Sequence, residues 1–412
     1  VTIDSVPGSV IENIGNLFLT QLGISETPHT LRVNPGLVSF NRSSIVWNGF
    51  GATPGNIQLN GGTFEVQDNF GGIGEVTNFS ASTISGFGII DADIDNDGSI
   101  LPSGTGLTIR GKFMQPAGSV TGSVITLTNS AAFEGKGTVN AGFTVPSGVN
   151  VTLTGDAQFG TFGAAAAAGI NMDGNVFLGG FNALFRDAGL IDFTGTTNLQ
   201  GGTLGVVNGG RVTAAAKLNG PGTLGGDWQM NGLLNTNGAL NVTAGSLTLG
   251  AVADTQLIMR NTAAGGFGSI NVAAPGIASL NGNLEVVFRD SFDYVDGDSF
   301  VIVNAPGGRA GGFTGVAYTN PRNGAIFNLV YAANAVRLRV VRGGCDSIDF
   351  NNNGVFPEDQ DVIDFFDVLA GGSPATCDPV QGCNGIDFNN NGVFPEDQDV
   401  IDFFNVLAGG AC

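Results

Sequence analysis

The chain has 412 residues and a formal net charge of −20, from 35 acidic and 15 basic side chains. Because the basic residues are few and form no patch in the sequence, nucleic acid is not expected as a partner. The 42% hydrophobic content argues against intrinsic disorder, and the 68 glycines follow no Gly-X-Y period, which excludes a collagen-like chain.

Residues 1–60 are predicted to form an N-terminal cap and the first strands, with Val10–Leu22 as a short helix or part of that cap. Residues 61–250 contain a loose repeat of roughly 20 residues, seen in Gly135–Val139 and Gly220–Leu224. Short alternately apolar segments end in Gly or Asn-Gly turns. The pattern predicts a parallel β-solenoid, whereas antiparallel β-sandwiches are the alternative.

Clustered acids in the solenoid region are the main candidates for chemistry outside the C-terminal tail. Asp91, Asp93, Asp95 and Asp97 alternate along the chain and are expected to face one side of a strand. Such a ladder indicates a solvated turn, a calcium site or, least of all, a polysaccharide-cleaving site. His29 is the single histidine of the chain, so no Ser-His-Asp set is indicated.

Residues 251–342 have longer apolar segments and more charge than the preceding repeats. A Gly-x-Leu-x-Val-x-Phe pattern at Gly282–Phe288 is followed by Gly-Asp-Ser-Phe-Val-Ile at Gly297–Ile302. With these motifs the segment resembles the end segment of autotransporter-passenger-like secreted β-helix proteins. The resemblance implies a cap over the open end of the solenoid, where a strand edge would otherwise be free to pair. Residues 341–344 are predicted to link this cap to the tail.

The tail contains all four cysteines, Cys345, Cys377, Cys383 and Cys412, which bracket the two halves of a duplication. An even number of bracketing cysteines predicts disulfides and an oxidising, extracellular setting. Repeat symmetry favours Cys345–Cys377 with Cys383–Cys412. The rival is a Cys345–Cys412 clasp with Cys377–Cys383.

The duplicated segment is Asp349–Phe366, which returns letter for letter as Asp387–Phe404. Each copy begins Asp-x-Asn-x-Asn-Gly, the opening of a calcium loop with oxygen ligands at positions 1, 3, 5 and 7. Position 12, normally an acid, is Gln360 or Gln398. Asp361 and Asp399 at position 13 are therefore the expected closing ligands. Asp359 and Asp397, or Glu358 and Glu396, are the alternative candidates for the closing ligand.

A short amphipathic helix is predicted after each loop, near residues 361–370 and 399–408. Val362, Phe365, Phe366 and Leu369 fall on one apolar stripe of the first helix. The two loop–helix units are expected to pack on each other, because neither can bury its phenylalanines alone. The predicted fold class is thus mainly β: a parallel β-solenoid with a small C-terminal α-helical calcium-loop module.

Residues 345–412 resemble a cysteine-flanked dockerin-type module, two tandem calcium loops each followed by a helix, as found on secreted bacterial surface proteins. The resemblance implies two bound Ca²⁺ ions and docking onto a cohesin-like or cell-surface partner. The ligand set that it implies comprises Asp349, Asn351, Asn353, the Val355 carbonyl, Asp387, Asn389, Asn391 and the Val393 carbonyl. Thirteen acids and no Lys or Arg in this tail also favour a bound cation.

The expected function is that of a secreted extracellular structural protein, a subunit of a calcium-stabilised fibre or surface layer that assembles head to tail. The alternatives are a dockerin-borne polysaccharide-degrading enzyme on a β-helix and a monomeric surface adhesin. The chain begins with Val1, so we expect a mature form whose signal peptide has been removed. No apolar run long enough for a membrane span occurs. Possible glycan sites are Asn41, Asn78, Asn150 and Asn241.

Overall fold

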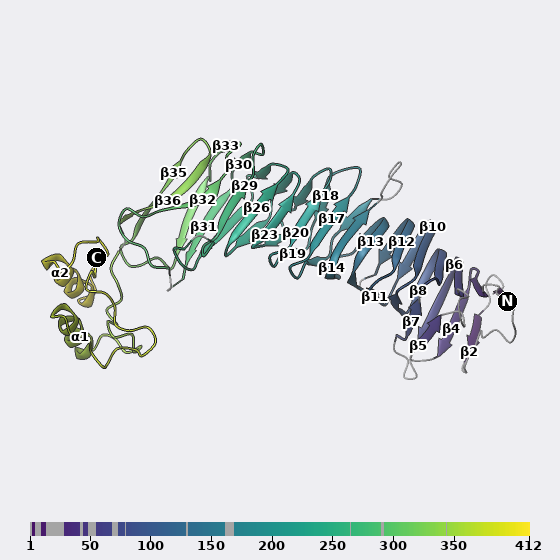
Figure 1. Cartoon of the computed structure of the whole chain (residues 1–412), viewed down its shortest axis with the longest axis horizontal. Helices are drawn as coiled ribbons and strands as arrows, with labels where there is room; N and C mark the ends of the chain where they lie inside the picture. The colour runs from purple at the N-terminus through teal and green to yellow at the C-terminus, as the bar shows by residue number, and fades with distance from the viewer. Residues whose placement is uncertain are drawn as a thin grey trace.

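The computed structural model describes all residues except 1, 5–9, 14–28, 42–43, 48–54, 68–72, 79, 129–130, 161–168, 264, 290–291 and 343. The described chain forms a long rod of stacked strands with a small helical module at its C-terminal end (Figure 1). All 36 strands of the described residues belong to one continuous sheet that winds around the rod. The parallel β-solenoid predicted from the repeats is therefore confirmed.

The strands have the following bounds. The first part of the rod contains β1 (Thr2–Asp4), β2 (Val10–Asn13), β3 (His29–Val33), β4 (Leu37–Asn41), β5 (Ser44–Trp47), β6 (Gly55–Gln67), β7 (Glu75–Asn78), β8 (Thr83–Asp91), β9 (Asp93–Asn96), β10 (Ser99–Ile109), β11 (Lys112–Gln115) and β12 (Ser119–Leu127). The middle contains β13 (Ala132–Val145), β14 (Asn150–Gly160), β15 (Ile170–Met172), β16 (Asn175–Phe177), β17 (Asn182–Arg186), β18 (Ile191–Phe193), β19 (Thr196–Asn198), β20 (Thr203–Val206), β21 (Gly210–Val212), β22 (Lys217–Asn219), β23 (Gly222–Gly225), β24 (Trp228–Met230), β25 (Leu233–Thr236), β26 (Ala239–Thr243) and β27 (Leu247–Leu249). The last part contains β28 (Asp254–Met259), β29 (Ser269–Val272), β30 (Ala278–Leu280), β31 (Asn283–Phe288), β32 (Ser299–Asn304), β33 (Arg309–Gly311), β34 (Gly315–Thr319), β35 (Ile326–Tyr331) and β36 (Ala335–Arg342).

Parallel stacking extends beyond the predicted 61–250 segment at both ends. β1 already pairs in parallel with β3, and β31 still pairs in parallel with β34. Val10–Asn13, predicted as helix or cap, is a strand that pairs with β4, and the rest of Val10–Leu22 lies outside the described residues. The turns of the solenoid vary in length. Side-chain hydrogen bonds between adjacent rungs join residues that are from 18 to 34 positions apart in the sequence. This variation makes the repeat loose in sequence.

The rod interior is filled by the apolar residues at alternate positions along the strands. In β9 the burial alternates strictly, so that Ile94 and Asn96 face inward while Asp93 and Asp95 face outward. An aromatic ladder runs through the interior, with ring centroids of adjacent members 4.8–5.7 Å apart. Its members are Phe113, Phe133, Phe159, Phe185, Phe193 and Trp228. These contacts join successive turns into one core.

Glycine is required where one rung passes close to the next. A Cβ at Gly86, where φ is +103°, would lie 1.8 Å from the carbonyl oxygen of Leu59. A Cβ at Gly160, where φ is +112°, would lie 1.9 Å from the carbonyl oxygen of Arg186. These close approaches, together with positive φ, account for part of the high glycine content.

The C-terminal end of the rod is closed by a change from parallel to antiparallel pairing. β36 lies between β32 and β35 and is antiparallel to both. Phe327, Val336 and Leu338 of this ribbon are buried against the core. Because β36 runs to Arg342, residues 341 and 342 of the predicted linker belong to the cap.

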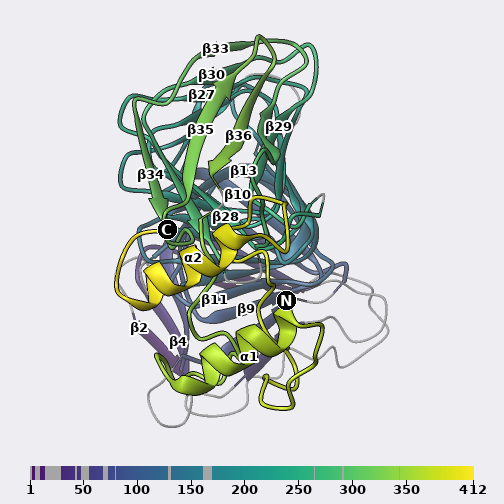
Figure 2. The ribbon, with the colours of Figure 1, turned by 90° about the vertical axis from the view of Figure 1, so that its left-hand side faces the viewer.

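The helical module contains α1 (Asp359–Leu369) and α2 (Asp397–Leu407), and it lies beside the end of the rod (Figure 2). The rings of Phe365 and Phe403 stack at 4.3 Å and form the centre of its core with Phe350 and Phe388. The two repeat units therefore pack on each other, as predicted. Neither helix, nor any other described helix, is long and apolar enough to cross a membrane.

Three details of the structure, two in the module and one in the rod, differ from expectation. Both helices begin two residues before the predicted start. Phe366, predicted on the buried stripe, is 42% exposed, because burial follows Phe365 and the loop residue Phe350 instead. Asn78, a candidate glycan site, is fully buried and donates to Asn96, so the folded chain cannot carry a glycan there.

The disulfides follow the rival pairing, and the pairing favoured by repeat symmetry is wrong. Cys345 joins Cys412, and Cys377 joins Cys383. The physical reason is that the two units pack side by side around a shared aromatic core, which brings the first and last residues of the module together. The six-residue separation between the other two cysteines closes a small loop beside the first repeat.

Candidate calcium-binding loops

The first loop is organised around the carboxylate of Asp349. Its Oδ1 accepts the Asn353 N–H at 3.0 Å and its Oδ2 accepts the Gly354 N–H at 2.9 Å. Gly354 has φ of +82° and Asn352 has φ of +57°, so the chain turns sharply here. This turn is the role of the glycine at position 6 of a calcium loop.

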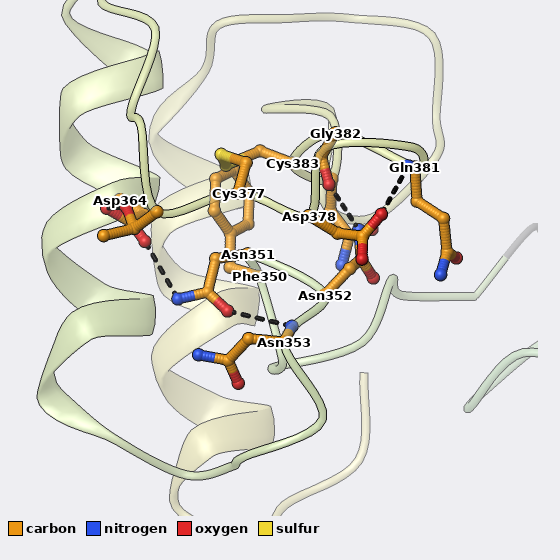
Figure 3. Close-up of a disulfide and its surroundings, with 12 residues drawn as sticks. Phe350, Asn351, Asn352, Asn353, Asp364, Cys377, Asp378, Gln381, Gly382 and Cys383 are labelled. Carbon is orange, nitrogen blue, oxygen red and sulfur yellow. Dashed lines mark hydrogen bonds between the residues drawn. A yellow bond between two sulfur atoms is a disulfide. The ribbon is translucent and has the colours of Figure 1, made fainter.

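The amide of Asn351 has a fixed orientation (Figure 3). Its Nδ2 donates to Oδ2 of Asp364 on α1 at 2.9 Å, and its Oδ1 faces the loop, where it accepts the Asn353 N–H at 3.1 Å. Asp364 is itself buried and also accepts bonds from Gln360 and Thr376. The amide oxygen of Asn351 is thereby held toward the loop, as a cation ligand would need.

Asn353, at position 5, is held in the same way. Its Nδ2 donates to Glu358 at 2.6 Å, and its Oδ1 accepts the Val355 N–H at 2.7 Å. Val355 lies at position 7 and its side chain is exposed. The Glu358 side chain thus accepts the Asn353 amide and also caps the N-terminus of α1.

Asp361, the expected closing ligand, is fully buried beside Asp349. Its carboxylate accepts the Phe350 N–H at 2.9 Å and the Glu358 N–H at 3.2 Å. Burial raises the pKa of Asp361, the backbone bonds oppose the rise, and the charge of Asp349 adds to it. Asp359 is exposed, so Asp361 remains the better candidate.

The second loop repeats this arrangement. Asp387 accepts the N–H groups of residues 391 and 392, and Asn389 donates to Asp402 at 3.0 Å. Asn391 donates to Glu396 and accepts the Val393 N–H at 2.7 Å. Burial raises the pKa of Asp399, and the charges of Asp387 and Glu396 contribute to the rise. The predicted ligand residues therefore come together in both loops, whereas Asp397 is exposed.

The donors available in each loop fit a hard cation. They are carboxylate, amide and backbone carbonyl oxygens, the ligands that Ca²⁺ takes. In the described part of the chain, no three His, Cys, Asp or Glu side chains of either loop lie within ligand distance of one another; the one group of this kind is Asp402 with Cys345 and Cys412, which are disulfide-bonded. A cation held by few charges in this way is expected to bind with Kd of roughly 10⁻⁵ to 10⁻³ M.

The two loops have identical sequences but different neighbours. Asn352 of the first loop donates to the Gly382 carbonyl at 2.9 Å and to Asn384 at 3.1 Å. Its counterpart Asn390 donates to the Gly344 carbonyl at 3.0 Å and to Asp346 at 2.9 Å. The first loop is therefore supported by the small disulfide loop, and the second by the start of the module.

Sequence reasoning missed the residues that orient the ligands. Asp364 and Asp402 were assigned no role, although a repeated acid adjoins the buried Phe365 or Phe403 on the inner face of each helix. An acid on the buried side of an amphipathic helix requires a hydrogen-bond partner. This requirement is the sequence signal that could have identified Asp364 and Asp402. Thr376 has no such signal, because its contact with Asp364 depends on how the disulfide loop folds.

The acidic ladder of the rod is partly neutralised. Asp91 pairs with Arg110 at 2.9 Å, and Asp93 accepts the Lys112 N–H at 2.6 Å. Partial burial raises the pKa of Asp95, with the charges of Asp97 and Glu75 adding to the rise. This arrangement favours a structural interpretation over a catalytic one.

A groove of about 590 Å³ lies on the rod over β25, β28, β31 and β34. Its polar lining residues bond to each other: Asn283 donates to Asp254 at 2.9 Å and Gln256 donates to Glu285 at 2.7 Å. Bonds from Thr319 and Gln256 lower the pKa of Glu285. Among the described lining residues there is no Arg or Lys.

No protein-family model matches the sequence, and no curated protein matches it.

Proposed function

We propose that this chain is a secreted, extracellular structural protein, a subunit of a calcium-stabilised fibre or surface layer. The observation that carries the proposal is the paired orientation of Asn351 by Asp364 and of Asn389 by Asp402. It turns two amide oxygens toward two loops that are otherwise rich in oxygen donors. Two equivalent candidate calcium sites at one end of a rod are suited to a calcium-dependent contact between subunits.

Bound Ca²⁺ would neutralise charge that the module otherwise cannot offset. The module has 13 acidic side chains and no Lys or Arg. Asp349, Asn351, Asn353, the Val355 carbonyl and Asp361 would hold the ion in the first loop, and the corresponding residues would hold it in the second. The two disulfides support an oxidising, extracellular location.

The rod supports a mechanical role. Its rungs are joined by continuous parallel pairing and by the aromatic ladder, so unfolding one turn exposes the apolar surface of its neighbours. A chain built in this way transmits force along its length without requiring any reaction.

The test is negative-stain electron microscopy of the purified chain with calcium and after addition of EGTA. Assemblies of rods that separate on chelation are the expected result. Single rods in both conditions would contradict the proposal and would favour a monomeric adhesin whose module binds a cohesin-like or cell-surface receptor.

A further inference from the structure

Large hydrophobic side chains are exposed in an unusual concentration on the helical module. Ile363 and Phe366 on α1 are 58% and 42% exposed, and Ile401 and Phe404 on α2 are 57% and 42% exposed. The Phe366 and Phe404 rings lie 6.0 Å apart, so the four side chains form one surface across both helices. We call these four residues the module face.

The charged residues on the two helices that carry the module face are all acidic. Asp359 and Asp367 on α1 and Asp397 on α2 are exposed. No Lys or Arg occurs anywhere in residues 345–412. A partner for this face should therefore present apolar side chains together with positive charge.

A surface of that chemistry lies on the outer side of the capping ribbon. Cross-strand register places Val301, Arg337 and Val330 in one row, and Ser299, Arg339 and Asn328 in the next. Arg337 and Arg339 are exposed and form no ion pair with another described residue. Val330 and Ile326 are 44% and 49% exposed. We call Ile326, Val330, Arg337 and Arg339 the ribbon face.

The two faces do not meet within one chain. The module is held against the rod by other residues, including the Asp296 N–H, which donates to the Asn390 carbonyl, and Arg322, which lies 3.6 Å from Asp346. In this position both faces remain exposed, and the helices lie beside the ribbon and not over it (Figure 2).

We propose that the ribbon face binds the module face of a second copy of this chain. The inference rests on the proposed function, because it specifies the contact through which the rods assemble. Apolar residues from both faces pack together, and Arg337 and Arg339 face the acids around the module helices. A second copy satisfies this contact without displacing the module from its own rod.

Because both faces lie at the same end of the chain, two copies related by a two-fold axis satisfy both contacts at once. The contact is then isologous and joins two rods through their C-terminal ends into a dimer, and growth of that dimer into a fibre or layer requires a further contact elsewhere on the rods. The isologous contact differs from the head-to-tail contact expected from the sequence, which would use opposite ends of the rod.

The first experiment is sedimentation velocity of the full chain in saturating calcium. The wild type is expected to form a dimer that dissociates as salt is raised, because the opposed charges are screened. The double variant Arg337→Glu with Arg339→Glu should weaken dimerisation at least ~10-fold. Its control, Lys136→Glu with Lys217→Glu, makes the same charge change on the rod wall and should dimerise normally.

The second experiment uses complementary variants. The chain with Ile363→Lys and Ile401→Lys should also fail to self-associate, since its module would face Arg337 and Arg339. Mixed with the Arg337→Glu, Arg339→Glu chain, it should form a heterodimer, because each ribbon then meets a module of opposite charge. Circular dichroism and calcium binding of each variant check that the fold is intact.

The outcomes separate this inference from the proposed function. Calcium-dependent assembly that the arginine reversals leave unchanged would overturn the ribbon contact and retain the structural role. A dimer that depends on the arginines but persists in EGTA would support the contact and contradict the calcium-dependent joint. A wild type that stays monomeric at every concentration would overturn the contact.

Discussion

The Asp296 N–H at the end of the rod donates a 3.0 Å hydrogen bond to the Asn390 carbonyl in the second loop. The side-chain amide of Asn352, the equivalent residue in the first loop, donates to the Gly382 carbonyl in the disulfide loop and to Asn384 just after that loop. The second candidate calcium loop therefore contacts the rod directly, whereas the first is supported from within the module. We therefore predict that the calcium affinities of the two loops, although their sequences are identical, respond to different supporting residues.

Arg322→Ala should weaken calcium binding in the second loop only. Arg322 contacts Tyr294 and Asp346, and its loss leaves the buried carboxyl of Asp346, whose pKa burial already raises, with less positive charge nearby. A loss of affinity of about 10-fold is expected for this supporting contact. The second loop alone is measured by titration in an Asp349→Ala background.

The matched variant for the first loop is Asn384→Ala. It removes amide bonds to the carbonyls of Ser347 and Asp349, so it should weaken the first loop and spare the second. The first loop alone is measured in an Asp387→Ala background. Equal effects of either variant on both loops would contradict the assignment of separate supports.

Asp364→Ala should lower calcium affinity in the first loop by about 10-fold or more, because the Asn351 amide loses the acceptor that fixes its orientation. The folded module should also lose about 1–3 kcal/mol, since the amide of Asn351 is left buried without that partner. Asp367→Ala on the exposed side of the same helix is the control. Calorimetric titration showing equal affinities for both variants would contradict the orienting role.

Phe159→Ala should destabilise the rod by about 3–5 kcal/mol, because Phe159 contacts Phe133, Phe143 and Phe185 in the aromatic ladder. Phe181→Ala, at a ring that is 37% exposed, should have a much smaller effect. Thermal unfolding followed by circular dichroism gives both values. Similar decreases in the free energy of unfolding for the two variants would show that the aromatic ladder does not stabilise the core.

Asn96→Leu should cost about 1–3 kcal/mol, because it removes the acceptor of the buried Asn78 amide at 2.7 Å. Replacing both residues by Leu should be nearly neutral, since Asn78 Oδ1 and Asn96 Nδ2 have no partner among the described residues. Chemical denaturation of the single and double variants checks this. Additive losses would contradict it.

Cys345→Ser with Cys412→Ser should destabilise the module more than Cys377→Ser with Cys383→Ser. The first bridge spans 67 positions and the second spans 6, so their contributions are about 4 and about 2 kcal/mol in the chain-entropy account. Unfolding of the module is followed by hydrogen exchange at the core phenylalanines. The reverse order would contradict the larger role of the clasp.

The solenoid could be predicted because its rules are local. Strands such as Asp93–Asn96 alternate inward and outward residues, and glycines such as Gly86 mark close approaches between rungs. The resemblance implied a cap over residues 251–342, but parallel rungs continue as far as β34, and only the ribbon of β35 and β36 closes the rod. That ribbon depends on pairing between β32 and β36, which are distant in sequence.

The candidate ligand residues of the loops follow from the Asp-x-Asn-x-Asn-Gly pattern, because they lie within a few positions of one another, and their binding of calcium stays a prediction. The orienting residue Asp364 and the disulfide pairing could not be predicted, because both depend on packing between helices and loops. Symmetry of the sequence was misleading for Cys345, which lies beside the last residue of the module and not beside Cys377.

Calcium titration of the full chain by isothermal calorimetry tests the central claim most directly. Binding of two Ca²⁺ per chain, reduced to one by either Asp349→Ala or Asp387→Ala and to none by both, is the predicted result. A folded wild-type chain that shows no binding heat at millimolar calcium would contradict the account.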